Sequence, residues 1–84
     1  REAKAGHASH FGLAAGALLR RKRLRIRHYN RAEDRETERE VSPQRLVHYR
    51  DNWYLDAWCH LRNGLRSFAV DAITAARMLE APAV

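Results

Sequence analysis

Residues 41–70 read VSPQRLVHYRDNWYLDAWCHLRNGLRSFAV, and this stretch decides the fold. In it, two runs rich in aromatic and apolar residues are separated by Asp51-Asn52 alone. Asp and Asn tolerate the positive φ angles of a tight two-residue turn, so the second run is predicted to fold back antiparallel on the first. Asn63-Gly64 predicts a second turn, followed by a third strand over residues 65–70. The middle of the chain is therefore predicted to be a β-meander.

Alternation along the middle strand of this meander sorts its side chains into two faces. With two-residue turns, Ala57 lies opposite Leu46 and Cys59 lies opposite Phe68. The apolar residues then coincide on one face in both pairings, which favours this register, because a slip of one residue would turn every side chain to the wrong face. The core face is predicted to hold Trp53, Leu55, Ala57, Cys59 and Leu61.

The opposite face carries Tyr54, Trp58 and His60, with polar or charged neighbours at nearly every step. Two interpretations of this face stay open. It is either a half-solvated sheet surface whose aromatics pack across strands, or a recognition surface whose rings stack on bases. Composition alone favours the first.

The chain has 84 residues, which predicts one domain with a limited core. It begins at Arg1 without a methionine, so we expect a fragment of a longer protein. No apolar run approaches the length of a membrane span, and no signal segment opens the chain. Cys59 is the single cysteine, so we predict a packed thiol in a reducing cytoplasm rather than a disulfide, a nucleophile or a metal ligand.

The segments around the meander are predicted from composition. Residues 1–12 are expected to be a linker or the end of a preceding segment, in which His7 and His10 are solvated and bind no metal. Residues 13–22 predict a helix with basic residues in its last turn. Residues 81–84 are expected to be a tail.

A dense basic run from Arg20 to His28 predicts a first strand whose outer face carries Arg23, Arg25 and Arg27. Such a face either guards an exposed strand against aggregation or contacts nucleic acid. The balance of 16 basic and 10 acidic residues, a net charge of +6, is compatible with both.

Further strands are expected on either side of the meander. Residues 37–41 predict a second strand, which Pro43 ends because proline cannot donate a ladder hydrogen bond. Residues 73–79 are either a last strand or a helical turn, and this choice stays open.

Three blocks of the sequence resemble the WYL domain. They are REVSPQRLV at 39–47, WYLDAWC at 53–59 and LRSFAVDAI at 65–73, in that order, and the resemblance covers about residues 18–79. It implies a mainly β fold, an Sm-like small five-stranded β-barrel preceded by a short N-terminal α-helix. The domain would span residues 13–80, with the helix at about 13–22 and the barrel at about 23–79.

The resemblance also implies a function. WYL domains occur mainly in bacterial transcription regulators, beside a winged helix-turn-helix and a C-terminal extension used in dimerisation, and are regarded as the effector-sensing part. We therefore expect a cytoplasmic regulatory domain with an anionic effector, single-stranded DNA or RNA or a nucleotide-like ligand. Operator DNA would be contacted through a separate domain of a homodimeric full-length protein, and no cofactor, metal or membrane is expected.

Carried over residue by residue, the family's ligand pocket falls first on Arg39 and Arg66. In physical terms these guanidinium groups would make bidentate contacts to phosphate or base edges. Arg66 is predicted to point into the barrel, where its charge needs a ligand, a carboxylate or water. Gln44 stands where many members have His, and Ala72 where a basic residue is usual. The remaining expected ligand contacts are Tyr29, Gln44, Tyr54, His60 and Arg62.

Two other classes of function were weighed. Asp56 with His60, or Cys59 with a histidine, could form an acid-base or nucleophilic pair, but Cys59 and His60 point to opposite faces and no oxyanion loop accompanies them. We therefore predict no catalytic residues. The stronger alternative is a structural or dimerisation module with no ligand of its own, because small barrels with open strand edges can assemble through them.

Overall fold

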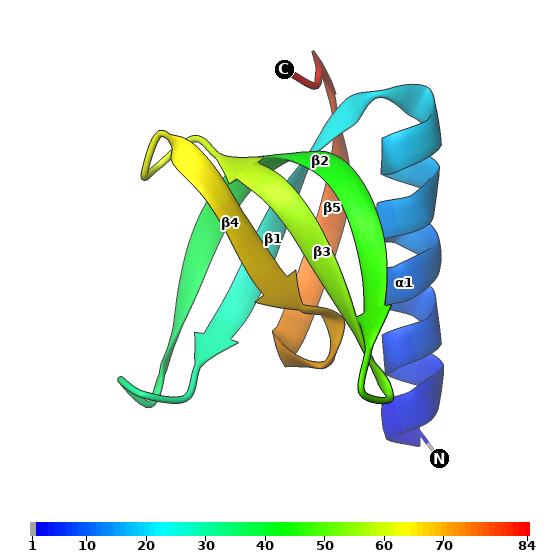
Figure 1. Ribbon diagram of the computed structural model, residues 1–84, viewed down its shortest axis with the longest axis vertical. Coiled ribbons are helices and arrows are strands. Elements are labelled where there is room, and N and C mark those ends of the chain that lie inside the picture. The colour runs from blue at the N-terminus through cyan, green and yellow to red at the C-terminus, as the bar shows by residue number, and fades with distance from the viewer. Residues whose placement is uncertain (1) are drawn as a thin grey trace.

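The computed structural model describes the backbone of residues 2–84 and the side chains of residues 10–84. One helix precedes five strands, with a short 3-10 helix before the last strand (Figure 1). The elements are α1 (Glu2–Arg20), β1 (Lys22–Asn30), β2 (Arg35–Tyr49), β3 (Asn52–Cys59), β4 (Gly64–Ala69), η1 (Val70–Ala72) and β5 (Ile73–Pro82).

The strands form one antiparallel sheet in the order β4-β3-β2-β1-β5, and Figure 1 shows that it is strongly bent. The mainly β class, the N-terminal helix and the five strands are confirmed. The closed Sm-like barrel is not, because β4 and β5 share no ladder in the described chain and the sheet stays open. The 3-10 helix η1 follows β4 directly, and β5 then pairs with β1 at the other edge of the sheet.

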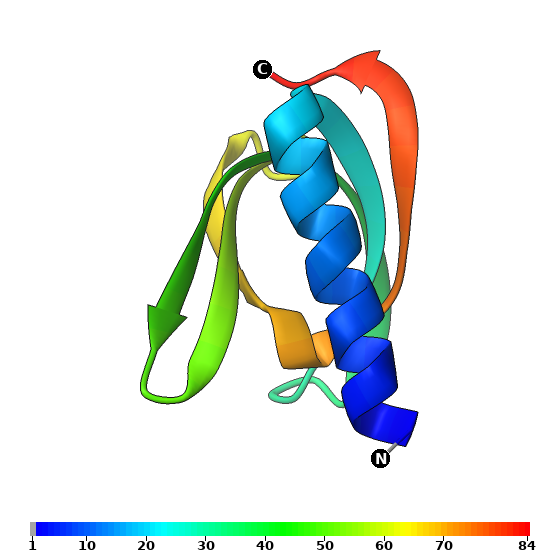
Figure 2. The ribbon, with the colours of Figure 1, turned by 90° about the vertical axis from the view of Figure 1, so that its right-hand side faces the viewer.

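Helix α1 lies across the concave side of the bent sheet, as Figure 2 shows. Its contact residues Ala14 and Ala17 are buried, and their small side chains let the helix backbone approach the strands closely. The apolar face of the sheet and this helix together form the core. Its other buried members are Leu24, Ile26, Val41, Leu55, Ala57, Cys59, Phe68 and Ile73.

The helix is longer than predicted. It begins at Glu2 and ends at Arg20, so the expected linker over residues 1–12 is wrong for residues 2–12. Packing against the sheet stabilises a helix well beyond its intrinsic propensity, and it outweighs the glycines in this segment. His10 is half-buried rather than solvated, whereas the side chain of His7 lies outside the described residues.

The first turn of the meander is one residue earlier than predicted. Arg50 and Asp51 form it, with φ angles of 52° and 67°, as a two-residue turn with φ positive at both positions requires. Leu46 therefore pairs with Leu55, and not with Ala57. The pairing moves by two residues, and a two-residue change keeps every side chain on its predicted face.

The second turn is longer than predicted, because β3 ends at Cys59 and β4 begins at Gly64. Phe68 consequently pairs with Leu55 rather than with Cys59. Leu61 falls in the turn and is 63% exposed, and Trp53 beside the first turn is 41% exposed. Both were expected in the core, whereas Leu55, Ala57 and Cys59 are buried as predicted.

Strand β2 does not end at Pro43. It continues to Tyr49 with a register irregularity between Pro43 and Arg45, which leaves Gln44 as an extra residue on this strand. A bulge of this kind accommodates a proline within a ladder and bends the strand. The open question at residues 73–79 is settled in favour of a strand, which extends through Pro82 into the expected tail.

Candidate anion-binding site

The basic outer face of β1 is neutralised by the neighbouring strand. Arg25 lies directly opposite Glu40, and Arg27 lies opposite Glu38. Nη1 of Arg23 lies 2.9 Å from Oε2 of Glu40. Three further ion pairs between these two strands have N···O distances of 3.8 Å: Arg25–Glu38, Arg25–Glu40 and Arg27–Glu36. The guanidinium next to Glu40 holds the pKa of that carboxyl below its usual value. This face therefore offers little unpaired positive charge to an anion.

Arg39 lies on the opposite, concave face, where it pairs with Ile26 of β1. Its side chain is buried, with 8% of the residue exposed. Nη1 donates to Sγ of Cys59 at 3.6 Å, and the buried Nε has no hydrogen-bond partner in the described part of the chain. A buried guanidinium without a carboxylate is costly, because desolvation of the charge is not offset.

Arg66 comes to the same face from β4, where it pairs with Ala57. It is exposed, so the predicted burial of its charge is wrong. The reason is that the longer turn places it opposite Ala57, near the open edge of the sheet, instead of opposite Leu61. Among residues 10–84, we find no hydrogen bond or ion pair that engages its guanidinium group.

His28 on β1 is influenced by the charges of both arginines and was not among the expected contacts. Its ring meets the ring of Phe68 edge to face, with centroids 5.1 Å apart and an interplanar angle of 78°. Burial lowers the pKa of His28, and the positive charges of Arg39 and Arg66 lower it further. Both arginines therefore act on one imidazole. Alternation along β1 through Leu24 and Ile26 already placed residue 28 on this face.

An open pocket of about 420 Å³ adjoins His28, and a neighbouring one of about 440 Å³ shares part of its lining. Together they bring Tyr29 of β1 and Tyr54 of β3 to one place, with Arg31 beside them. The Oη of Tyr29 donates to Oδ1 of Asp34 at 2.5 Å, and this hydrogen bond raises the pKa of the phenol. Two expected ligand contacts, distant in sequence, thus line one surface.

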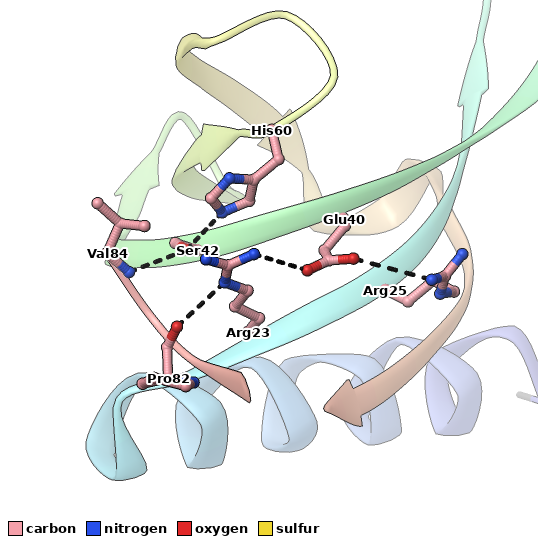
Figure 3. Close-up of polar contacts among 7 residues, drawn as sticks. All are labelled: Arg23, Arg25, Glu40, Ser42, His60, Pro82 and Val84. Atoms are coloured by element: carbon pink, nitrogen blue, oxygen red, sulfur yellow. Dashed lines mark hydrogen bonds and ion pairs between the residues drawn. The ribbon is translucent and has the colours of Figure 1, made fainter. Parts of the chain in front are cut away.

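Two other expected contacts, Gln44 and His60, lie instead near Val84. Figure 3 shows His60 there beside Ser42. The Oγ of Ser42 lies 2.8 Å from Nε2 of His60 and accepts the backbone N–H of Val84 at 3.1 Å. Gln44 donates to the carbonyl of Val84 at 3.0 Å. Gln44 and Ser42 therefore hold Val84 against β2, while His60 contacts Ser42. Neither Gln44 nor His60 lines the two pockets at Tyr29.

Arg62 contributes to the site through its backbone. Burial raises the pKa of the Cys59 thiol, but the N–H of Arg62, the guanidinium of Arg39 and the N–H of Leu61 outweigh it, and the pKa is lowered overall. The side chain of Arg62 is exposed in the turn. Cys59 is buried, as predicted, and its Sγ accepts the hydrogen bond from Arg39 on the concave face.

Within the described residues, no three side chains of His, Cys, Asp or Glu come together as metal ligands. The pair of Ser42 and His60 resembles part of a nucleophilic site, but Ser42 is fully buried and its Oγ is engaged by Val84. Helix α1 is too polar in the described chain to be a membrane span, and no other helix there is long enough.

Comparisons with known proteins give consistent matches. The model of the WYL domain family matches residues 9–78. Protein PafC of Mycobacterium leprae (strain TN) is 40% identical over 76 residues, which cover 89% of this chain and 24% of that protein. The solved structure of proteasome accessory factor B/C (PafBC) of Arthrobacter aurescens superposes with a TM-score of 0.86 at 30% identity, over 92% of this chain and 12% of that chain. This chain therefore spans a small part of each relative.

Proposed function

This chain belongs to the WYL domain family, and from that premise we propose that it is the ligand-sensing domain of a bacterial transcriptional regulator. Its effector is anionic, a single-stranded nucleic acid or a nucleotide-like ligand, and occupancy of the site controls a separate DNA-binding domain. The observation that carries the proposal is Arg39, a buried guanidinium that has no carboxylate partner in the described chain.

The electrostatics of the concave face support an anionic ligand. Arg39, Arg66 and His28 lie on this face, whereas the glutamates of β2 lie on the other and neutralise β1 there. A phosphate near the two guanidinium groups would provide the opposite charge that no ion pair of Arg39 or Arg66 supplies among residues 10–84. Charge-assisted hydrogen bonds of this kind are shorter and stronger than neutral ones.

The pockets beside His28 support a ligand that carries flat rings as well as phosphate. Tyr29 and Tyr54 offer aromatic surface there, and Arg31 adds a cation. Stacking of bases on aromatic side chains, combined with backbone phosphate contacts, is the usual mode of single-strand binding. A short single strand or a nucleotide meets both requirements.

We further propose that this domain is one part of a longer, homodimeric regulator in the cytoplasm, in which another part contacts operator DNA. The chain covers 24% of PafC, which is compatible with further domains. Contacts through Gln44, His60 and Arg62 remain part of the proposal. They would require the C-terminal corner to open, since Gln44 and His60 are engaged there.

A dimerisation module without a ligand is the second candidate, and the open sheet favours it. β4 and β5 are edge strands, and Leu65 on β4 is 62% exposed. An exposed apolar edge can pair with the edge of a second copy. Light scattering of the chain across a concentration series measures this directly.

Binding of a fluorescent oligothymidylate, with duplex DNA as a competitor, separates the two candidates. Arg66→Ala should weaken binding by about 10- to 100-fold, on the order of 1.5–3 kcal/mol for a charge-assisted contact. The matched control is Arg27→Ala, which removes the same charge from the outer face, where Arg27 lies 3.8 Å from Glu36. It should change the affinity less than about threefold, as expected for an exposed ion pair.

Salt dependence gives a further check. Two or three phosphate contacts predict a slope of log affinity against log salt of roughly −1.4 to −2.1 for a single strand. Equal losses in both variants would indicate unspecific attraction to a basic protein and refute the site. Self-association without oligonucleotide binding would favour the dimerisation module.

A further inference from the structure

His28 connects two strands that share no hydrogen bonds. In the order β4-β3-β2-β1, two strands separate β1 from β4, yet the ring of His28 contacts the ring of Phe68 on β4 at 5.1 Å. The bend of the sheet brings these positions together. Arg66 is two residues from Phe68 on the same face of β4, and Arg39 is diagonally adjacent to His28, which pairs with Thr37. The charges of two arginines from different strands therefore reach the imidazole.

The groups around His28 are unusually one-sided in charge. The charged or titratable groups of the concave strands near it are Arg39 on β2, Cys59 on β3 and Arg66 on β4. Tyr29, Arg31 and Tyr54 line the pocket that His28 also lines, and Asp71 at η1 lines the neighbouring one. The charges of Arg39 and Arg66 are the ones that act on the imidazole, and both disfavour its protonation. The carboxylates that face β1 from β2, by contrast, lie on the outer face with the paired arginines. Without a ligand, His28 is therefore held neutral at neutral pH.

We propose that His28 is the third cationic arm of the anion site, and that it takes up a proton when a phosphate-bearing ligand binds beside Arg39 and Arg66. This inference rests on the proposed function of that site. A bound phosphate replaces the positive potential at the imidazole by a negative one, and protonation then supplies an additional N–H donor to the ligand. The imidazole also lines the pocket of Tyr29 and Tyr54, so it adjoins the aromatic part of the proposed site.

Proton uptake on binding has a defined sign. Because the ligand raises the affinity of His28 for a proton, a proton must raise the affinity of the site for the ligand by the same factor. Binding is therefore stronger in acid and weaker as the pH rises through the titration range of the bound imidazole. Each unit by which the ligand raises the pKa of His28 allows a change of up to about tenfold in affinity.

Oligothymidylate is the appropriate probe, because neither its phosphodiesters nor its bases change charge between about pH 5.5 and pH 8, the range around the ordinary histidine pKa of about 6.5. Its affinity for the 84-residue chain would be measured at both ends of this range at constant ionic strength. The chain should bind about three- to tenfold more tightly at the lower pH. His28→Gln should bind with an affinity that no longer changes between the two. The matched control His48→Gln, at an exposed histidine whose ring lies 4.9 Å from that of Trp53 at a tilt of 45°, should keep the full pH dependence.

Calorimetry in two buffers of different ionisation enthalpy gives a second readout on the unmodified chain. Net uptake of a fraction of a proton per oligonucleotide near pH 6.5 is expected, and its loss in His28→Gln assigns it to this residue. Binding that requires Arg66 but takes up no proton, or that stays pH-dependent in His28→Gln, would overturn the role of His28 and leave the proposed function intact. No binding at any pH would overturn both.

Discussion

Replacement of Arg39 by methionine should make the ligand-free chain more stable. Methionine keeps much of the buried hydrocarbon of the arginine and removes a charge that has no carboxylate partner in the described chain. The chain loses the contact between Nη1 and Sγ of Cys59, at 3.6 Å, which is worth at most about 1 kcal/mol. It gains relief from desolvation of the guanidinium and from its repulsion with His28, and exchanging buried ionic groups for apolar residues is known to stabilise proteins by about 1–4 kcal/mol.

The net gain expected for Arg39→Met is about 1–3 kcal/mol in the free energy of unfolding. For a domain of this size, that corresponds to an increase of roughly 4–24 °C in Tm. Urea and thermal denaturation of the ligand-free chain measure it. The matched control is Arg23→Met, because Arg23 contacts Glu40 at 2.9 Å and the carbonyl of Pro82 at 3.0 Å. This variant should lose about 0.5–2 kcal/mol.

The reasoning is refuted if Arg39→Met unfolds at a lower urea concentration than the unmodified chain by as much as Arg23→Met does. Such a result would mean that Arg39 serves the fold, so that its burial would give no argument for a ligand. Increased stability together with lost oligonucleotide binding would instead show the exchange of stability for function that binding sites commonly display.

Two further predictions concern acid and the C-terminal corner. The free energy of unfolding should fall in two steps as the pH is lowered. The first step lies below about 6.5, where the unfolded chain protonates His28 before the folded chain does, and the second lies below about 4.5, where the same holds for Glu40. Urea denaturation of His28→Gln should lack the first step, and an unchanged profile would contradict the assignment. Ser42→Ala should lower the free energy of unfolding by about 1–3 kcal/mol and accelerate hydrogen exchange at the amide of Val84, because it removes the Oγ that accepts this N–H and contacts His60. Unaltered exchange would show that Ser42 does not hold Val84 in place.

The fold was predictable to the extent that it depends on alternation. The burial of Leu55, Ala57 and Cys59 follows from the two-residue alternation of a strand. Both turns were misplaced, but each changed the predicted pairing by an even number of residues, so these side chains stayed on the predicted face. The turn itself was misplaced because Asp and Asn have the stronger local preference, whereas the structure places Arg50 at positive φ and gains the pairing of Leu46 with Leu55. Local preference gave way there to packing across the strands.

The limits of the site prediction have the same origin. The basic outer face of β1 could not be judged without the partner strand, and register alone shows that Glu38 and Glu40 neutralise it. The burial of Arg39 beside Cys59 depends on how the strands bend around the core, which alternation along β2 alone does not give. His28 could have been found by extending the alternation of Leu24 and Ile26 by one step.

The most direct test of the account is an NMR titration of the chain with single-stranded oligothymidylate, followed at the guanidinium Nε–H of Arg39. This proton has no acceptor in the described chain, so a bound phosphate should shift its resonance and slow its exchange with water, in a saturable manner shared with the imidazole of His28. Saturable shifts confined to Arg25, Arg27 and the outer face, with the Arg39 signal unmoved, would contradict the claim that the concave face binds the anion.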